Sequence, residues 1–140
     1  MKAMMLTGLR AMEMREVPEP AMTAANHVLL KLADRINRHY QRRLRKMVKC
    51  LRASGFAARL PGGTFYLYVP APCGAGAADF ATAEDASQFL IREHLISTVP
   101  WDDAGAFLRF SATFESAGDK DDDRVVAELG ARLAKAQLRF

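Results

Sequence analysis

Apolar residues follow two different periods along this chain, and the change falls near Leu32. Residues 2–7 and 12–17 are short alternating runs on either side of Gly8, a pattern typical of a β-hairpin. The apolar run 27–32 comes after two prolines and indicates a third strand. The first 32 residues therefore predict an N-terminal β-hairpin segment followed by one further strand.

From residue 33 the apolar positions recur at the spacing of a helix. One stripe of apolar side chains runs through residues 33–54, while basic residues occupy most other positions. The stripe consists of Ile36, Tyr40, Leu44, Met47, Val48 and Leu51. Gly55 follows, and a glycine in the left-handed conformation often ends a helix. The pattern predicts a helix over 33–54 that buries this stripe.

The rest of the chain alternates between strand and helix signals. Aromatic and β-branched runs predict strands at 64–69, 95–99 and 107–113, with a loop at 70–78. Thr82 with acidic residues behind it predicts a helix to about residue 94, and Asp119 with an acidic first turn predicts a last helix. This order predicts an α+β fold, a small sheet covered by helices.

Composition and charge divide the chain at the same place. Of seven methionines, six lie in the first 22 residues. Net charge is +1 over residues 1–32, +8 over 33–59 and −5 over 60–140, for a total of +4. We therefore expect one segment at 1–32 and one domain at 33–140. The basic helix 33–54 could bind nucleic acid or an acidic partner, although such charges are more often simply solvated.

Cysteine, histidine and hydropathy patterns exclude several classes of site. Cys50 and Cys73 give no disulfide framework, and His27, His39 and His94 show no metal-ligand spacing. No apolar run approaches the roughly 18 residues that cross a bilayer, and no secretory core is present. The expectation is a cytoplasmic protein that binds neither metal nor membrane.

The first segment carries a resemblance of its own. Met1-Lys-Ala-Met-Met-Leu-Thr-Gly8, Met12-Glu-Met-Arg-Glu-Val-Pro-Glu-Pro20 and Val28-Leu-Leu-Lys31 resemble the start of the GroES-like domain of zinc-dependent alcohol dehydrogenases. In that family a Gly-x-Cys-Gly segment with the first zinc ligand follows within several residues. Here no cysteine occurs before Cys50, so the resemblance implies neither a zinc site nor dehydrogenase activity.

A second resemblance covers about residues 33–140. It rests on Tyr40-Gln-Arg-Arg43, Pro61-Gly-Gly-Thr-Phe-Tyr-Leu-Tyr-Val-Pro-Ala-Pro72, Phe80-Ala-Thr-Ala-Glu-Asp85, Phe89-Leu-Ile-Arg-Glu93, Ile96-Ser-Thr-Val-Pro-Trp101 and Gly105-Ala-Phe-Leu-Arg-Phe-Ser111. In this order the motifs resemble the carboxy-terminal small domain of fold-type I, class I/II pyridoxal-phosphate aminotransferases, nearest to the aspartate and LL-diaminopimelate branch. The resemblance implies that Arg109 binds the α-carboxylate of an amino acid or keto acid.

The chemistry of Arg109 suits that role without requiring it. The residue lies within an apolar strand, and a buried guanidinium is costly unless an anion meets it. Its planar fork grips a carboxylate with two parallel hydrogen bonds. The alternatives are an arginine on the solvent face of an edge strand, or one paired with Asp102 or Asp103.

Transamination also needs a Schiff-base lysine and a phosphate site, which the resemblance places in a large domain upstream of the residues matched here. No lysine of this chain lies in the family's setting, so we assign no catalytic and no cofactor-binding residue. We expect a recombined gene product that is inactive alone and binds no pyridoxal phosphate by itself. Its partners would be a complementary aminotransferase large domain or a second copy. A basic interaction module and a non-functional rearrangement product remain the alternatives.

Overall fold

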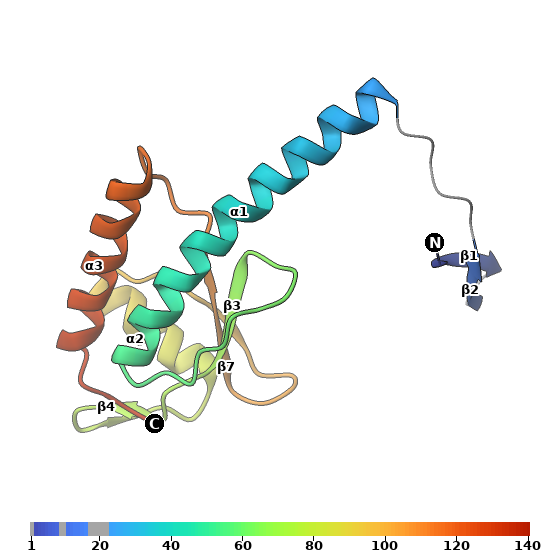
Figure 1. Ribbon diagram of the computed structural model, residues 1–140. Helices are drawn as coiled ribbons and strands as arrows, with labels where there is room; N and C mark the ends of the chain where they lie inside the picture. Colours follow the sequence, from blue (N-terminus) through green and yellow to red (C-terminus); the bar gives the residue numbers. More distant parts are fainter. Residues whose placement is uncertain (1, 9–10, 17–22) are drawn as a thin grey trace. The chain divides into compact units, whose positions relative to one another are not determined.

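The computed structural model describes residues 2–8, 11–16 and 23–140, and the chain separates into two compact units, Met1–Arg35 and Ile36–Phe140 (Figure 1). In the first unit, β1 (Lys2–Gly8) pairs antiparallel with β2 (Ala11–Glu16), with Met4 opposite Met14. The register shifts between Leu6 and Gly8. None of the helices in the described part of the chain is long and apolar enough to cross a membrane.

The prediction of a strand over 27–32 is wrong, because these residues lie in the helix α1 (Ala24–Ala53). Thr23 starts this helix: its side-chain oxygen accepts the Asn26 N–H at 3.2 Å. An apolar run of this length fits a strand or a helix equally well, and here the helical stripe of the following residues extends back through it. The strand that the alcohol dehydrogenase resemblance implied is therefore absent at these positions.

The second half of α1 buries the predicted stripe. Leu44, Met47, Val48 and Leu51 are buried, whereas Ile36 remains 46% exposed. The helix ends as predicted: Gly55 has a φ of +94°, and a Cβ there would lie 2.6 Å from the Phe140 ring. The backbone conformation therefore favours glycine at this position, and a side chain there would also have to displace the Phe140 ring.

The main sheet has three antiparallel strands in the order β3 (Tyr66–Pro70), β7 (Phe107–Ser111), β6 (Val99–Trp101). Side chains alternate between its faces, and Leu67, Val69, Leu108 and Phe110 point into the core. The strand expected at 95–99 starts only at Val99. The preceding residues instead close the helix α2 (Ala83–His94), since Leu95 adopts the left-handed conformation and the Ile96 N–H donates to the Leu90 carbonyl.

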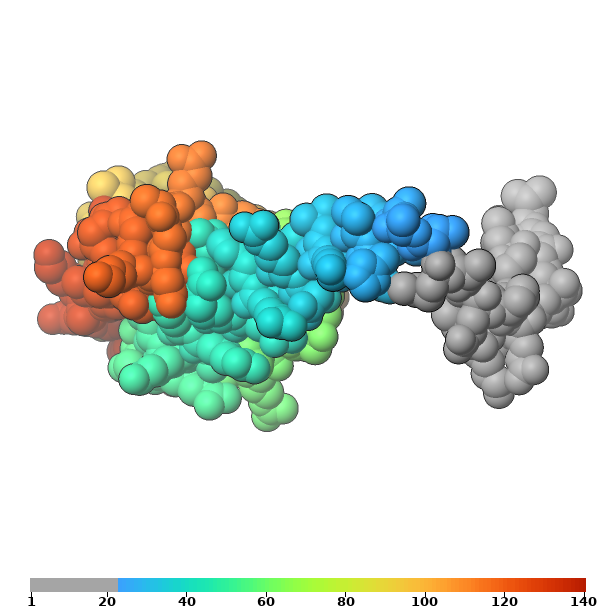
Figure 2. All heavy atoms as spheres, turned by 45° about the horizontal axis from the view of Figure 1, so that its top comes forward, coloured from blue at the N-terminus to red at the C-terminus, as the bar shows by residue number. Residues whose placement is uncertain are grey.

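The other two helices begin close to the predicted positions. Thr82 and Asp85 form a reciprocal capping box at the start of α2 (Ala83–His94). The last helix, α3 (Asp119–Lys135), is capped by Gly118 rather than by Asp119. On the face shown in Figure 2, the first half of α3 abuts α1.

A second small sheet lies within and beyond the predicted loop. It joins β5 (Ala78–Asp79), β4 (Gly74–Ala75) and β8 (Leu138–Arg139). Backbone approach is very close here: a Cβ on Gly74 would meet the Ala78 carbonyl oxygen at 2.4 Å. The described residues form three helices and small antiparallel sheets, so the predicted α+β class is confirmed.

Candidate functional site

Arg109 lies on the central strand of the main sheet. Its Cα partners are Tyr68 on β3 and Val99 on β6, so the alternative of an edge-strand arginine is wrong. Strand alternation turns its side chain away from the core, onto a face that we call the outer sheet face. This face is formed by Tyr66, Tyr68, Val99, Trp101, Phe107 and Arg109.

The guanidinium of Arg109 contacts an aromatic ring, and no acid pairs with it among the described residues. Its central carbon lies 4.4 Å from the centroid of the Tyr66 ring. Its Nε is buried and has no hydrogen-bond partner among the described residues. A buried donor without a partner costs free energy that an incoming acceptor would recover.

The second alternative, pairing of Arg109 with a nearby aspartate, also finds no support among the described residues. Asp102 accepts hydrogen bonds from the Ala83 N–H at 2.8 Å and the Glu84 N–H at 3.3 Å, and so caps α2. No described carboxylate forms an ion pair with Arg109. Arg109 is therefore a half-buried cation whose fork remains available to an anion.

Arg43 is a buried arginine that sequence reasoning missed, and its surroundings are the opposite of those of Arg109. Its Nε donates to Asp122 Oδ1 at 3.0 Å, and its terminal nitrogens donate to the carbonyls of Ala112 and Phe114 and to the Ser116 hydroxyl. Each of its three nitrogens thus has a partner within the protein. Its position beside Leu44 in the apolar stripe of α1 was the signal available in the sequence.

Asp122 completes this buried cluster from α3. Burial by itself would raise the pKa of this carboxyl, but hydrogen bonds from Ser116, Arg42 and Arg43 outweigh it and lower the pKa to about 2. The carboxylate is fully buried, and Arg42 reaches its second oxygen at 3.1 Å. Arg43 and Asp122 therefore join α1 to α3.

The same contacts explain the uneven charge. Lys46 pairs with Asp119 and, at 2.8 Å, with Asp123. Arg42 pairs with Asp119 at 2.8 Å. Three basic residues of α1, Arg42, Arg43 and Lys46, therefore meet acidic residues at the start of α3. This arrangement weakens the idea that the helix is a surface for nucleic acid, since several of its cations already have partners.

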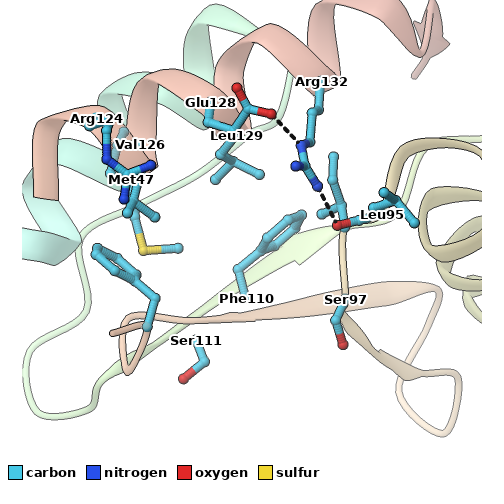
Figure 3. A pocket seen from close by; sticks show the side chains of 13 residues that line it. Met47, Leu95, Ser97, Phe110, Ser111, Arg124, Val126, Glu128, Leu129 and Arg132 are labelled. Atoms are coloured by element: carbon cyan, nitrogen blue, oxygen red, sulfur yellow. Dashed lines mark hydrogen bonds and ion pairs between the residues drawn. The ribbon is translucent and has the colours of Figure 1, made fainter. Parts of the chain in front are cut away.

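An apolar cavity of about 360 Å³ lies on the core side of the sheet, away from Arg109 (Figure 3). Met47, Phe110, Val126 and Leu129 line it. At its rim, Arg132 donates to Glu128 at 2.7 Å and to the Leu95 carbonyl at 3.0 Å. Because this cation is already paired, the cavity offers apolar contacts and little chemistry.

The lysines of residues 23–140 do not fit the attachment of pyridoxal phosphate. That role needs an amine whose pKa is lowered by desolvation or by a neighbouring cation. In Lys46 the pKa is instead raised, by hydrogen bonds to Asp119 and Asp123. The other lysines of residues 23–140 are exposed; they are Lys31, Lys49, Lys120 and Lys135. In the described residues, no three His, Cys, Asp or Glu side chains gather as metal ligands would.

Comparison with known proteins finds curated relatives, although no protein-family model matches the chain. The LL-diaminopimelate aminotransferase of Methanocaldococcus jannaschii is 50% identical over 118 residues, which is 79% of this chain. The enzyme of the same name from Methanococcus maripaludis is 47% identical over 129 residues, or 86% of this chain. This chain resembles one part of an aminotransferase. It spans 28% and 31% of the lengths of these two relatives.

Solved structures give the same picture of the aminotransferase-like fold. The aspartate aminotransferase of Rhizobium meliloti matches 71% of this chain with a TM-score of 0.56 and 25% identity. An aromatic aminotransferase from Pyrococcus horikoshii matches 76% of this chain with a TM-score of 0.59 and 19% identity. Substrate-bound BacF from Bacillus subtilis matches 79% of this chain with a TM-score of 0.62 and 20% identity. At such identities the last two show the fold alone. The chain covers 26% or 27% of each of these three structures.

Proposed function

We propose that residues 33–140 act as the carboxylate-binding part of a pyridoxal-phosphate aminotransferase, with Arg109 gripping the α-carboxylate of the substrate. The observation that carries this proposal is the half-buried guanidinium of Arg109, whose Nε has no partner among the described residues. Similarity to two LL-diaminopimelate aminotransferases supports it. The substrate would be an amino acid and its keto acid, with LL-diaminopimelate the first to test.

The geometry suits a planar anion. The Tyr66 ring covers one face of the guanidinium, so that donors in the plane of the fork stay free for two parallel hydrogen bonds to a carboxylate. The surrounding outer sheet face is mainly aromatic and apolar, but Tyr68, Val99 and Trp101 are 43–45% exposed. On this proposal water is excluded from the charged pair only when a partner covers the face. On this proposal Arg109 binds and orients the substrate and moves no proton.

The cofactor chemistry belongs elsewhere on this proposal. Pyridoxal phosphate supplies the electron sink for transamination, and the lysines of residues 23–140 do not fit its attachment. A complementary large domain would hold the cofactor, and the outer sheet face would meet that domain or a second copy of this chain. We therefore expect the chain by itself to form no keto acid when incubated with pyridoxal phosphate and an amino acid.

Acetate titration of the chain tests the carboxylate site. The Arg109 Nε–H resonance should shift with a saturable dependence on sodium acetate, in the range of tens of millimolar for about one charge-assisted, bidentate contact. Equal concentrations of sodium chloride should not shift it. The Arg109 resonance is assigned with Arg109→Lys, which removes it. Arg92→Lys, at an exposed position of α2, is the matched control and should leave this resonance in place. An equal shift in chloride would contradict the proposal.

A further inference from the structure

Tyr66 lies beneath the guanidinium of Arg109, and we infer that it is a positioning residue that holds this fork in the orientation needed for a carboxylate. The inference rests on the proposed function and adds a residue to it. Tyr66 is a diagonal neighbour of Arg109, because the Cα partners in this part of the sheet are Tyr68 with Arg109 and Tyr66 with Ser111. Across that diagonal the centroid of the Tyr66 ring lies 4.4 Å from the central guanidinium carbon of Arg109.

A long arginine side chain loses several rotatable bonds of freedom when it binds a ligand. At Arg109, among the residues described, neither an ion pair nor a hydrogen bond at Nε limits that freedom beforehand. The Tyr66 ring is a contact that limits it. Ordering the fork before the ligand arrives reduces the entropy lost on binding, which raises affinity without adding a contact to the ligand.

Tyr66 is itself supported by a row of aromatic rings. Phe65 packs against Tyr66 with ring centroids 4.3 Å apart, and Tyr40 of α1 packs against Phe65 at 5.6 Å. The backbone just before Tyr66 is held as well, since the Ala112 N–H donates to the Phe65 carbonyl at 2.9 Å. The row Tyr40, Phe65, Tyr66 thus connects the buried half of α1 to Arg109.

Tyr68 provides a matched control on the same strand and the same face. It lies directly opposite Arg109, yet its ring stacks on Phe107 with centroids 4.5 Å apart and planes 11° apart. Removing the Tyr68 ring therefore removes a similar aromatic surface without removing the ring that contacts the guanidinium. Tyr66→Phe keeps the ring and loses the hydroxyl, so it separates the contribution of the Tyr66 ring from that of its hydroxyl group.

The test measures the order parameter of the Arg109 Nε–H bond by nitrogen-15 relaxation in the full chain. We expect about 0.8 in the wild type, in Tyr66→Phe and in Tyr68→Leu, and a value below about 0.6 in Tyr66→Leu. The acetate titration is the second measurement, and Tyr66→Leu should weaken acetate binding about threefold to tenfold, with Tyr66→Phe restoring it. Unchanged urea unfolding midpoints show that the variants are folded.

The two measurements separate the two ideas. If the order parameter does not fall in Tyr66→Leu, the role of Tyr66 is overturned whatever acetate does. If the order parameter falls in Tyr66→Leu but the wild type binds no acetate at Arg109, the proposed function is overturned. The conclusion that Tyr66 orders the guanidinium is then still supported. An equal loss of order in Tyr68→Leu would also overturn the inference, because the effect would then belong to the sheet as a whole.

Discussion

Arg43 and Asp122 join α1 to α3 through a hydrogen bond of 3.0 Å between Nε and Oδ1, although they lie 79 residues apart in the sequence. Both side chains are buried, and Ser116 and two backbone carbonyls use the remaining donors of the arginine. A buried pair of this kind need not be more stabilising than an apolar contact, but breaking it leaves one charge without a partner.

Removing the acid should therefore destabilise the fold strongly. We predict that Asp122→Asn lowers the free energy of unfolding by about 3 kcal/mol, because Arg43 is left buried and charged. Asp123→Asn is the matched control, since Asp123 is 66% exposed and pairs with Lys46 at the surface, where such pairs contribute at most about 1 kcal/mol. Urea unfolding at pH 7 measures both. Equal losses in the two variants would contradict the role given to the buried cluster.

Acid should weaken the same cluster. The folded pKa of Asp122 is about 2, below its ordinary value of 3.8, so its stabilisation is complete above about pH 4 and is lost as pH falls towards 2. The stability difference between the wild type and Asp122→Asn should shrink by about 2 kcal/mol over that window. Urea titrations at several pH values measure it. A difference that stays constant down to pH 2 would mean that Asp122 has an ordinary pKa.

Gly55 should tolerate no side chain. Its φ is +94°, and the Phe140 ring lies 2.6 Å from the place that a Cβ would take, so we expect Gly55→Ala to be unfavourable by about 1–2 kcal/mol. Gly62→Ala is the control, because nothing lies within 4 Å of a Cβ there and its φ is not positive. Thermal unfolding compares the two variants. Equal melting temperatures for the two would show that the end of α1 can relax around the added methyl group.

Local signals in the sequence predicted the elements that are specified locally. The Thr82 and Asp85 pair marks the start of α2, and the aromatic run after Gly63 marks β3, because capping and strand preference act over a few residues. The run 27–32 carries no such signal, and its helical state follows from the start at Thr23 and the stripe that continues into α1. Periodicity alone does not separate the two outcomes for so short a run.

Other features depend on contacts between distant residues. The pairing of β4 with β8 brings Gly74 opposite Arg139, and no local pattern predicts it. For Arg109, the apolar strand was predictable, but its central place in the sheet and its contact with Tyr66 depend on strand order. The buried role of Arg43 was hidden for the same reason, since its acid partner lies on another helix.

Enzyme kinetics on a chimera test the central claim most directly. Residues 33–140 replace the aligned segment of the Methanocaldococcus jannaschii LL-diaminopimelate aminotransferase, and transamination of LL-diaminopimelate is measured with a keto-acid acceptor. We predict an active chimera in which Arg109→Lys lowers kcat/KM about 100-fold, mainly through KM, because a buried carboxylate loses its bidentate partner. Arg92→Lys should leave kcat/KM unchanged. An active chimera that is indifferent to Arg109→Lys would contradict the account.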